Sequence, residues 1–452
     1  MARTLAAVAR EVQGNLHGAD APFGAVSTDS RTLEKGSLFV AIKGERFDGN
    51  DYVGAAHSKG AAGALVSRVS EVPLPQVEVN DTRQAFGRMA RAWRRNFTVP
   101  VVAVTGSSGK TTVKELIGTI LSVRRKVCVT AGSLNNDIGL PLTLMRISPE
   151  HEAVVVELGA NHPGEIDYLA GVAEPTIGVI TNAAAAHLEG FGSIEGVVAA
   201  KGELLDHLPA AGTAVLNADD PFVEEWRKRV RRATVVTFGF AANADCRVLG
   251  EPRFDSTGAD FTLRLPDGVE LAVRVPLLGR QNVANALAAA AAARAAGATA
   301  AEIAAGLARA TAVRGRLRPL KGLRGAVVVD DSYNANPGSV RAALDYLAER
   351  PGKRILVLGD MAELGAEGPK LHREVGAYAA SRCDELVAVG ALAAEAARAF
   401  GSGARECADI DAVRQAIEPE LGPGVTVLVK GSRVMQLDRL VEALEDRQER
   451  AC

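Results

Sequence analysis

Between residues 100 and 112 the chain reads Pro-Val-Val-Ala-Val-Thr-Gly-Ser-Ser-Gly-Lys-Thr-Thr. The apolar run 101–104 predicts a short buried strand, and the pattern that starts at Lys110 predicts a helix directly after the loop. Glycines in such a loop let backbone N–H groups approach an anion, and the helix N-terminus adds a favourable dipole. The stretch therefore predicts a phosphate-binding loop, in which Lys110 meets the outer phosphates and the Thr111 hydroxyl binds Mg²⁺. The candidate nucleotide contacts are Thr105, Gly106, Ser107, Ser108, Gly109, Lys110, Thr111 and Thr112.

The spacing of this loop departs from the standard phosphate-loop pattern at one position. Val104 occupies the place of the first glycine, so the alternative is an ordinary glycine-rich turn before a helix. The order strand, loop and helix favours the nucleotide-binding interpretation.

Composition bounds the class of protein. A chain of 452 residues with 47% hydrophobic and 23% charged residues is ordinary for a soluble globular protein of about three domains. The net charge of −2 gives no reason to expect nucleic acid or a membrane surface as a partner. The five cysteines are scattered and odd in number, which favours a reducing cytoplasm. No signal peptide is expected, and the apolar run 287–293 is nearly all alanine and ends at Arg294, which predicts a packed helix and not a membrane span.

Apolar runs and helical stretches alternate along most of the chain, which predicts an α/β fold in three domains. Residues 1–97 are expected to form a small mixed domain with a strand at 38–42 and a helix at 82–96. The runs 101–104, 153–156, 177–181 and 213–216 predict a mainly parallel sheet in residues 98–312, with a β-hairpin excursion at 246–276. The runs 326–329, 355–358, 386–389 and 425–429 predict a doubly wound third domain in residues 313–452.

Unusual polar residues follow these runs at their carboxyl ends. Ligands of open α/β sheets gather beyond that edge of the sheet. The sequence therefore predicts a cleft between the second and third domains, to which both contribute. The polar residues that follow a run are Lys110, Glu157, Asn182, Asp330, Asp331, Gly359, Asp360, Lys430 and Gly431.

Further motifs follow the phosphate loop in a fixed order. With that loop, the set resembles the Mur ligases of bacterial cell-wall synthesis, and the resemblance covers nearly the whole chain. The last two motifs are similar to those of the member that joins D-alanyl-D-alanine to a UDP-N-acetylmuramoyl tripeptide. In order, the motifs begin at Asn135, Glu157, Thr181, Ala200, Gly279 and Arg314, and the last two span 330–337 and 359–365.

The resemblance implies an ATP-dependent ligase that uses Mg²⁺. ATP phosphorylates the terminal carboxylate of the nucleotide-linked peptide, and the amine of D-alanyl-D-alanine then attacks the acyl phosphate. Two anionic groups must meet, so cations and positioning are expected to supply much of the catalysis. The residues implied as catalytic are Lys110, His187, Lys201 and Arg314.

The metal ligands implied by the resemblance are Thr111, Glu157, His187 and a carbamylated Lys201. A carbamate turns the lysine cation into a carboxylate that can help to hold a metal. The alternatives are a strand-end salt bridge for Glu157, a capping role for His187, and an ion pair between Lys201 and Glu203.

Nucleotide contacts outside the loop come from three places. Asn282 resembles the adenine-side contact, although Gln281 stands where the family commonly has His. Arg314 resembles the arginine that meets the transferring phosphate, and its alternative is a solvated linker arginine. Asp331 resembles the ribose-contacting acid, with Asp330 as the competing candidate.

Substrate contacts are expected in the remaining polar loops. Each of these clusters has a turn or a helix cap as its alternative. The loop around the UDP moiety is expected to comprise Ser27, Asp29, Ser30 and Arg31. A substrate loop is expected to open at Asn135 and Asn136. The dipeptide or the nucleotide is expected to be oriented by Asn334 and Asn336.

The sequence leaves three rival functions: a sibling ligase that adds a single amino acid, a folylpolyglutamate synthetase, and a nucleotide-driven switch. The motifs at 331–337 and 359–365 argue against the first two, and a pure switch has no need of Glu157, His187 and Lys201 together. The protein is expected to be a monomer. The third residue of the tripeptide, diaminopimelate or lysine, is left open.

Overall fold

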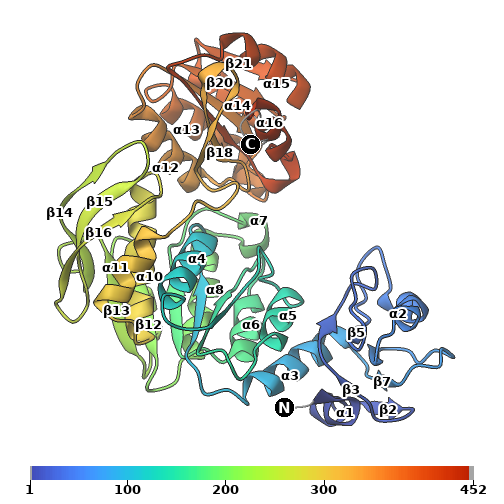
Figure 1. Ribbon diagram of the computed structural model, residues 1–452. Coiled ribbons are helices and arrows are strands. Elements are labelled where there is room, and N and C mark those ends of the chain that lie inside the picture. The colour runs from blue at the N-terminus through green and yellow to red at the C-terminus, as the bar shows by residue number, and fades with distance from the viewer. Residues whose placement is uncertain (1–2, 447–452) are drawn as a thin grey trace.

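The computed structural model describes residues 3–446 and contains three sheet-bearing units, which follow one another along the chain (Figure 1). The N-terminal unit carries a five-stranded sheet in the order β2-β7-β6-β5-β4, and β1 pairs with β3 beside it. The strands are β1 (Arg3–Thr4), β2 (Asn15–His17), β3 (Pro22–Phe23), β4 (Val26–Ser27), β5 (Leu38–Val40), β6 (Gly63–Val66) and β7 (Gln76–Glu78). The helices are α1 (Leu5–Val12), η1 (Gly49–Tyr52), α2 (Val53–Ser58) and α3 (Thr82–Arg94).

The central unit is built on a nine-stranded sheet in the order β16-β15-β14-β13-β12-β11-β8-β10-β9. The strands are β8 (Val101–Thr105), β9 (Val127–Val129), β10 (Ala153–Glu157), β11 (Ile177–Ile180), β12 (Thr213–Asn217), β13 (Thr234–Gly239), β14 (Cys246–Phe254), β15 (Ala259–Arg264) and β16 (Glu270–Val275). The helices are α4 (Lys110–Leu121), α5 (Gly139–Met145), α6 (Glu165–Ala173), α7 (Leu188–Phe191), α8 (Ile194–Asp206), α9 (Val223–Arg229), α10 (Arg280–Ala295) and α11 (Ala300–Ala308).

The C-terminal unit has a six-stranded sheet in the order β17-β18-β22-β19-β20-β21. The strands are β17 (Arg318–Lys321), β18 (Val327–Asp331), β19 (Lys353–Gly359), β20 (Glu385–Val389), β21 (Ala404–Cys407) and β22 (Val425–Lys430). The helices are η2 (Leu323–Gly325), α12 (Pro337–Ala348), η3 (Gly365–Glu367), α13 (Gly368–Ala379), α14 (Ala393–Phe400), α15 (Ile410–Ile417), η4 (Glu418–Glu420), η5 (Arg433–Met435) and α16 (Asp438–Leu444).

Strand β8 shows why the central sheet carries helices on both faces. Its side chains alternate, so Val101 and Ala103 join one buried cluster and Val102 and Val104 join the other. The first cluster includes side chains of α3, α6 and α8, and the second includes side chains of α4, α10 and α11. A strand buried on both faces reads as a continuous apolar run, which is the pattern that identified it in the sequence.

The parallel ladder predicted from the apolar runs is confirmed. β8 pairs in parallel with β10 and β11, β11 with β12, and β18 and β19 each with β22. The hairpin predicted in 246–276 is also present, because β15 and β16 pair antiparallel. It is not a separate excursion, however: β14 pairs with both β13 and β15, so the antiparallel strands extend the main sheet.

The sequence prediction missed several strands: β1 to β4, β6 and β7 in the N-terminal unit, β9 and β13 in the central unit, and β17 and β21 in the C-terminal unit. Strands β9 and β17 show why. The first has three residues, and β17 is an edge strand that reads Arg-Pro-Leu-Lys, so neither presents the long apolar run of a central strand. The predicted strand 177–181 ends at Ile180, and the predicted helix 82–96 ends at Arg94.

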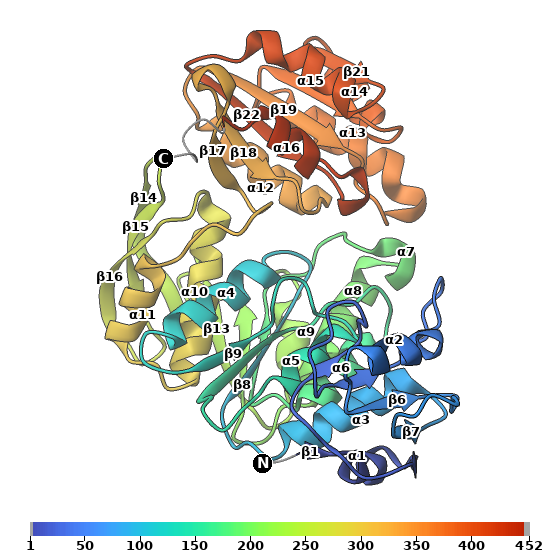
Figure 2. The ribbon, with the colours of Figure 1, turned by 45° about the vertical axis from the view of Figure 1, so that its right-hand side comes forward.

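The C-terminal unit faces the edge of the central sheet at which α4 begins, and both views place α7 on that side (Figures 1 and 2). Within residues 3–446, no helix combines the length and the apolar character that a membrane crossing needs.

Candidate active site

The loop between β8 and α4 is tied to the end of the neighbouring strand β11. Thr181 donates its hydroxyl to the Ser108 carbonyl at 2.6 Å, and the Ser107 N–H donates to the Asn182 carbonyl at 3.0 Å. Gly106 has φ +141, and a Cβ added there would lie 2.0 Å from the Thr181 hydroxyl. Only glycine therefore fits, and the loop has the strand–loop–helix geometry of an anion cradle.

Lys110 begins α4 and turns back across the loop. Its Nζ donates to the Gly106 carbonyl at 2.7 Å. Burial lowers the pKa of Lys110, although the nearby carboxylate of Glu157 opposes the shift. The amine therefore lies at the loop that it was predicted to serve, with an acidic side chain close by.

A cavity of about 320 Å³ lies between the phosphate loop and the C-terminal unit. Eight of the predicted site residues line it: Ser107, Ser108, Gly109, Thr112, Asn282, Asp331, Asn334 and Asn336. Its lining also includes polar residues that were not assigned a site role: Asn182, Asn217, Gln281, Asn285, Arg316, Ser339 and Lys430. Asn182 and Lys430 carried a usable signal, because each follows an apolar run at its carboxyl end.

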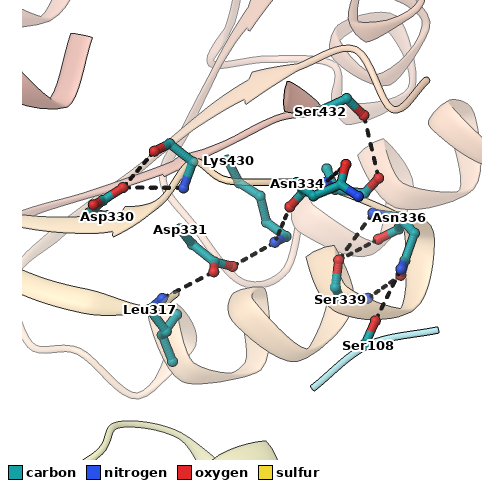
Figure 3. A network of polar contacts seen from close by, with 11 residues as sticks. Ser108, Leu317, Asp330, Asp331, Asn334, Asn336, Ser339, Lys430 and Ser432 are labelled. Atoms are coloured by element: carbon teal, nitrogen blue, oxygen red, sulfur yellow. Dashed lines mark hydrogen bonds and ion pairs between the residues drawn. The ribbon is translucent and has the colours of Figure 1, made fainter. Parts of the chain in front are cut away.

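The C-terminal wall of the cavity is held by an ion pair (Figure 3). Lys430 Nζ lies 2.6 Å from Asp331 Oδ2 and donates to the Asn334 carbonyl at 3.0 Å. The Leu317 N–H donates to Asp331 Oδ1 at 3.0 Å. Asp330 is 2% exposed and accepts from Ser332 and from the Gly315 N–H. Of the two competing acids, Asp331 therefore faces the cavity, and Asp330 stabilises the backbone around it.

Asn336 connects the two walls of the cavity. Its Oδ1 accepts from the Ser339 N–H and caps α12, which is the alternative weighed from the sequence. Its Nδ2 also donates to the Ser108 hydroxyl at 3.0 Å, so one amide joins the C-terminal unit to the phosphate loop (Figure 3). Asn334 accepts from the Ala335 N–H, which is a turn contact.

Two arginines lie in the linker between the central and C-terminal units. Arg316 lines the cavity, and its guanidinium lies 4.2 Å from the centre of the Tyr333 ring. Arg314 lies outside the cavity lining, and its side chain is 60% exposed and paired with Glu442. In this arrangement Arg316 has the access to the cavity that was expected of Arg314.

Glu157 ends β10 and is 2% exposed. Its Oε1 accepts from the Asn135 amide at 2.7 Å, and its Oε2 is buried without a hydrogen-bond partner in the described chain. A buried carboxylate oxygen with no donor is costly unless a cation or a ligand reaches it. The salt-bridge alternative for Glu157 is not what this structure contains, because its partner is the neutral amide of Asn135.

His187 and Lys201 lie on adjoining elements. His187 is the N-cap residue of α7 with φ 54, and its imidazole contacts the Glu363 carboxylate of the C-terminal unit. Lys201 on α8 is 1% exposed, with Nζ 3.5 Å from the Ala160 carbonyl and 5.0 Å from the centre of the Phe191 ring. Burial, with a smaller contribution from the nearby Lys110 cation, lowers the pKa of Lys201 to about 7.

The alternative that pairs Lys201 with Glu203 does not fit the contacts. Both carboxylate oxygens of Glu203 accept from backbone N–H groups, at 2.8 Å from Gly164 and 3.0 Å from Asp167. Within residues 3–446, Lys201 makes no ion pair. The structure therefore leaves a buried amine with weak polar contacts.

The side chains of Glu157 and His187 fit a magnesium site in which substrate phosphates and water would supply the remaining ligands. Among residues 3–446, no cluster of three or more His, Cys, Asp or Glu side chains is arranged to hold a metal. Mg²⁺ is usually held by one or two carboxylates, substrate phosphates and water. The orphan oxygen of Glu157 beside the phosphate loop is the donor that such a site would use.

The predicted substrate residues at 27–31 of the N-terminal unit and at Asn136 of the central unit make local contacts with their own segments. Ser27 donates its hydroxyl to the Asp29 carbonyl at 3.0 Å, and Asp29 pairs with Arg31 at 2.8 Å. The hydrogen bonds from Arg31 lower the pKa of Asp29 to about 2. Ser30 is 9% exposed. Asn136 accepts from the Gly139 N–H at 2.9 Å and so helps to start α5.

The chain is similar to known proteins along nearly its whole length. Family models match three stretches: "Mur ligase family, catalytic domain" at 22–94, "Mur ligase middle domain" at 104–293, and "Mur ligase, glutamate ligase domain" at 315–433. UDP-N-acetylmuramoyl-tripeptide–D-alanyl-D-alanine ligase of Escherichia coli is 46% identical over 98% of each chain. A crystal structure of MurF from Acinetobacter baumannii has a TM-score of 0.92 at 34% identity, covering 98% of this chain and 99% of its own. MurF from Thermotoga maritima, crystallised with ADP, has a TM-score of 0.83 at 28% identity, covering 95% and 98%.

Proposed function

The chain belongs to the Mur ligase family, and from this membership we propose that it joins D-alanyl-D-alanine to a UDP-N-acetylmuramoyl tripeptide at the expense of ATP. One observation carries the proposal. The cavity is walled on one side by a phosphate loop and on the other by Asp331 and Lys430, which belong to a different sheet. An ATP bound in this cavity would lie between the two units, where the tripeptide carboxylate and the amine of D-alanyl-D-alanine can meet.

The phosphate loop and its lysine prepare the first chemical step. Backbone N–H groups at the start of α4 hold the triphosphate, and Lys110 neutralises charge on its outer end. The tripeptide carboxylate attacks the terminal phosphoryl group, so a C–O–P bond forms and ADP leaves. Arg316 is placed to meet the charge on the transferring group, a role that the family resemblance gives to Arg314. A rotation of the C-terminal unit relative to the central unit would allow Arg314 to leave Glu442 and contact the phosphate.

The second step joins the amine to the activated acid. The amine of D-alanyl-D-alanine attacks the acyl carbon, the C–N bond forms, and inorganic phosphate leaves with the C–O–P oxygen. The ammonium form must lose a proton before it can attack. Exclusion of water from the cavity protects the acyl phosphate from hydrolysis. The hydrogen bond from the Asn336 amide to the Ser108 hydroxyl joins the two walls of this cavity.

We propose Asn282 and Asp331 as nucleotide contacts on the adenine and ribose sides, since both line the cavity. For Mg²⁺ we propose Thr111, Glu157 and His187, and the ion would neutralise phosphate charge when bound. Lys201 is proposed to carry a carbamate, because a buried amine without an ion pair can react with CO₂ in its neutral form. Asn135 is proposed to orient Glu157 through its 2.7 Å hydrogen bond.

We propose the unit boundaries 1–97, 98–312 and 313–452, in which the first holds the UDP part of the substrate. The polar turn at 27–31 supplies the candidate contacts to the UDP part, and the loop at 135–136 of the central unit supplies further substrate contacts. A monomer in the cytoplasm is proposed as the working form. The reducing compartment is supported by the cysteines, because all four that lie within residues 3–446 are free thiols.

A ligase assay with mass detection of the product tests the proposal. D-alanyl-D-alanine is offered against diaminopimelate, lysine and glutamate, with tripeptides that end in either diaminopimelate or lysine. The expected product is the pentapeptide, formed only with D-alanyl-D-alanine and matched by one ADP per bond. ATP hydrolysis without an amide product would identify a nucleotide-driven switch instead, and a product with a single amino acid would identify a sibling ligase.

A further inference from the structure

Glu363 brings a carboxylate of the C-terminal unit against the imidazole of His187. It lies in the loop that follows β19, whereas His187 precedes α7 on the side of the central unit that faces it (Figures 1 and 2). The contact is made to Nδ1 of His187, an atom that is buried and has no well-aligned hydrogen bond in residues 3–446. A second contact joins the same two segments, because the Glu189 N–H donates to the Glu363 carbonyl at 3.2 Å.

Both residues have unusual backbone conformations. His187 has φ 54 and Glu363 has φ 63, in the left-handed region that non-glycine residues rarely adopt. Such conformations cost free energy and persist where the surrounding structure requires them. Here they aim two side chains from different units at each other.

The loop that carries Glu363 is held firmly by its own unit. Asp360 accepts from the Ala393 N–H at 2.7 Å, the Met361 N–H donates to the buried His372 at 2.9 Å, and the Ala362 N–H donates to Ser432 at 2.8 Å. Three consecutive residues before Glu363 are thus anchored. The position of its carboxylate consequently follows the position of the whole C-terminal unit.

We propose that Glu363 is a positioning residue for the metal site: it accepts the Nδ1 proton of His187 and so leaves the Nε2 lone pair free for Mg²⁺. The inference rests on the proposed function, in which His187 is a metal ligand. A ligating histidine commonly gives its other ring N–H to a carboxylate, which fixes the tautomer and raises the basicity of the ligating nitrogen. This matters more for Mg²⁺ than for softer metals, because imidazole is a weak ligand for a hard cation.

A consequence concerns the two units. The carboxylate comes from the C-terminal unit and the imidazole from the central unit, so the metal site is complete only when the two are in contact. By linkage, metal binding must then favour the contact as much as the contact favours metal binding. Glu363 thereby makes the placement of the C-terminal unit a condition for full metal affinity.

The test measures Mn²⁺ affinity by electron paramagnetic resonance, in the full-length protein saturated with a non-hydrolysable ATP analogue. We expect Glu363→Ala to weaken Mn²⁺ binding by about 10- to 100-fold, the usual effect of removing such a partner. Glu363→Gln should recover part of the affinity, since its amide oxygen can still accept the Nδ1 proton. Glu367→Ala is the matched control, because this nearby glutamate pairs with Lys370 and should leave Mn²⁺ affinity unchanged.

A second measurement reports the tautomer of His187 directly and does not depend on Mn²⁺ affinity. Nitrogen-15 spectra of labelled histidine, assigned with His187→Ala, should give the Nδ1-protonated tautomer of His187 in the wild-type protein, and Glu363→Ala should abolish this preference. Wild-type Mn²⁺ affinity in Glu363→Ala, with weakened affinity in His187→Ala, would overturn the role of Glu363 alone. Wild-type affinity in His187→Ala would instead remove His187 from the metal site, and the inference with it.

Discussion

The buried amine of Lys201 gives the sharpest prediction about this site. Its pKa is about 7 instead of the ordinary 10.5, chiefly because burial disfavours the ammonium form. At pH 7.5 an amine with a pKa of about 7 is about three-quarters neutral, whereas an ordinary lysine is about 0.1% neutral. Lys201 therefore presents several hundred times more of the form that reacts with CO₂.

We expect wild-type protein in ¹³C-bicarbonate to show a carbamate carbon resonance that is missing from Lys201→Ala. The resonance should weaken as the pH falls through about 7, because protonation removes the reactive amine. Lys126→Ala is the control, since this lysine is exposed and paired with Glu150. The assay is completed by ligation rates, which Lys201→Ala should nearly abolish and which bicarbonate or a short carboxylate should partly restore.

Two results would refute this reasoning about Lys201. Full ligation activity in Lys201→Ala would show that no metal-bridging carbamate is needed. A carbamate resonance that survives in Lys201→Ala would belong to another amine. In either case the low pKa of Lys201 would be a cost of burial and not part of the mechanism.

Three further perturbations test the surrounding structure. Gly106→Ala should weaken ATP binding in calorimetry and cost about 1–3 kcal/mol of stability, because its Cβ would lie 2.0 Å from the Thr181 hydroxyl; wild-type affinity would contradict the close fit. Asp331→Ala should lower the free energy of unfolding in urea by about 3–5 kcal/mol, because it leaves the buried Lys430 ammonium without its carboxylate partner. Adding Lys430→Met should recover most of the loss, and additive losses would contradict a buried pair. Burial lowers the pKa of His372 below the ordinary 6.5, so the neutral imidazole stabilises the fold fully above about pH 6.5 and this contribution is lost as the pH falls below that value. An unfolding free energy that falls with pH by the same amount in His372→Gln as in the wild-type protein would refute this.

The sequence by itself determined the fold class and the edge of the sheet at which the site lies. Runs such as 101–104 and 355–358 are apolar throughout because these strands are buried on both faces, and such runs are readable without a structure. The phosphate loop is equally local, since its glycines, lysine and helix start lie within one short stretch. Membership of a known family is a property of the whole sequence, which is why the resemblance extended along nearly all of the chain.

Only the tertiary structure decided which of several similar side chains reaches the cavity. Asp331 faces it and Asp330 does not, although they are neighbours, because successive side chains of β18 point to opposite sides. Arg316 lines the cavity and Arg314 pairs with Glu442, a difference set by how the linker crosses between two units. The contact of Glu363 with His187 joins residues far apart in the sequence, and no local pattern encodes such a distance. Periodicity and spacing report on neighbours along the chain, whereas these choices depend on how separate sheets are placed.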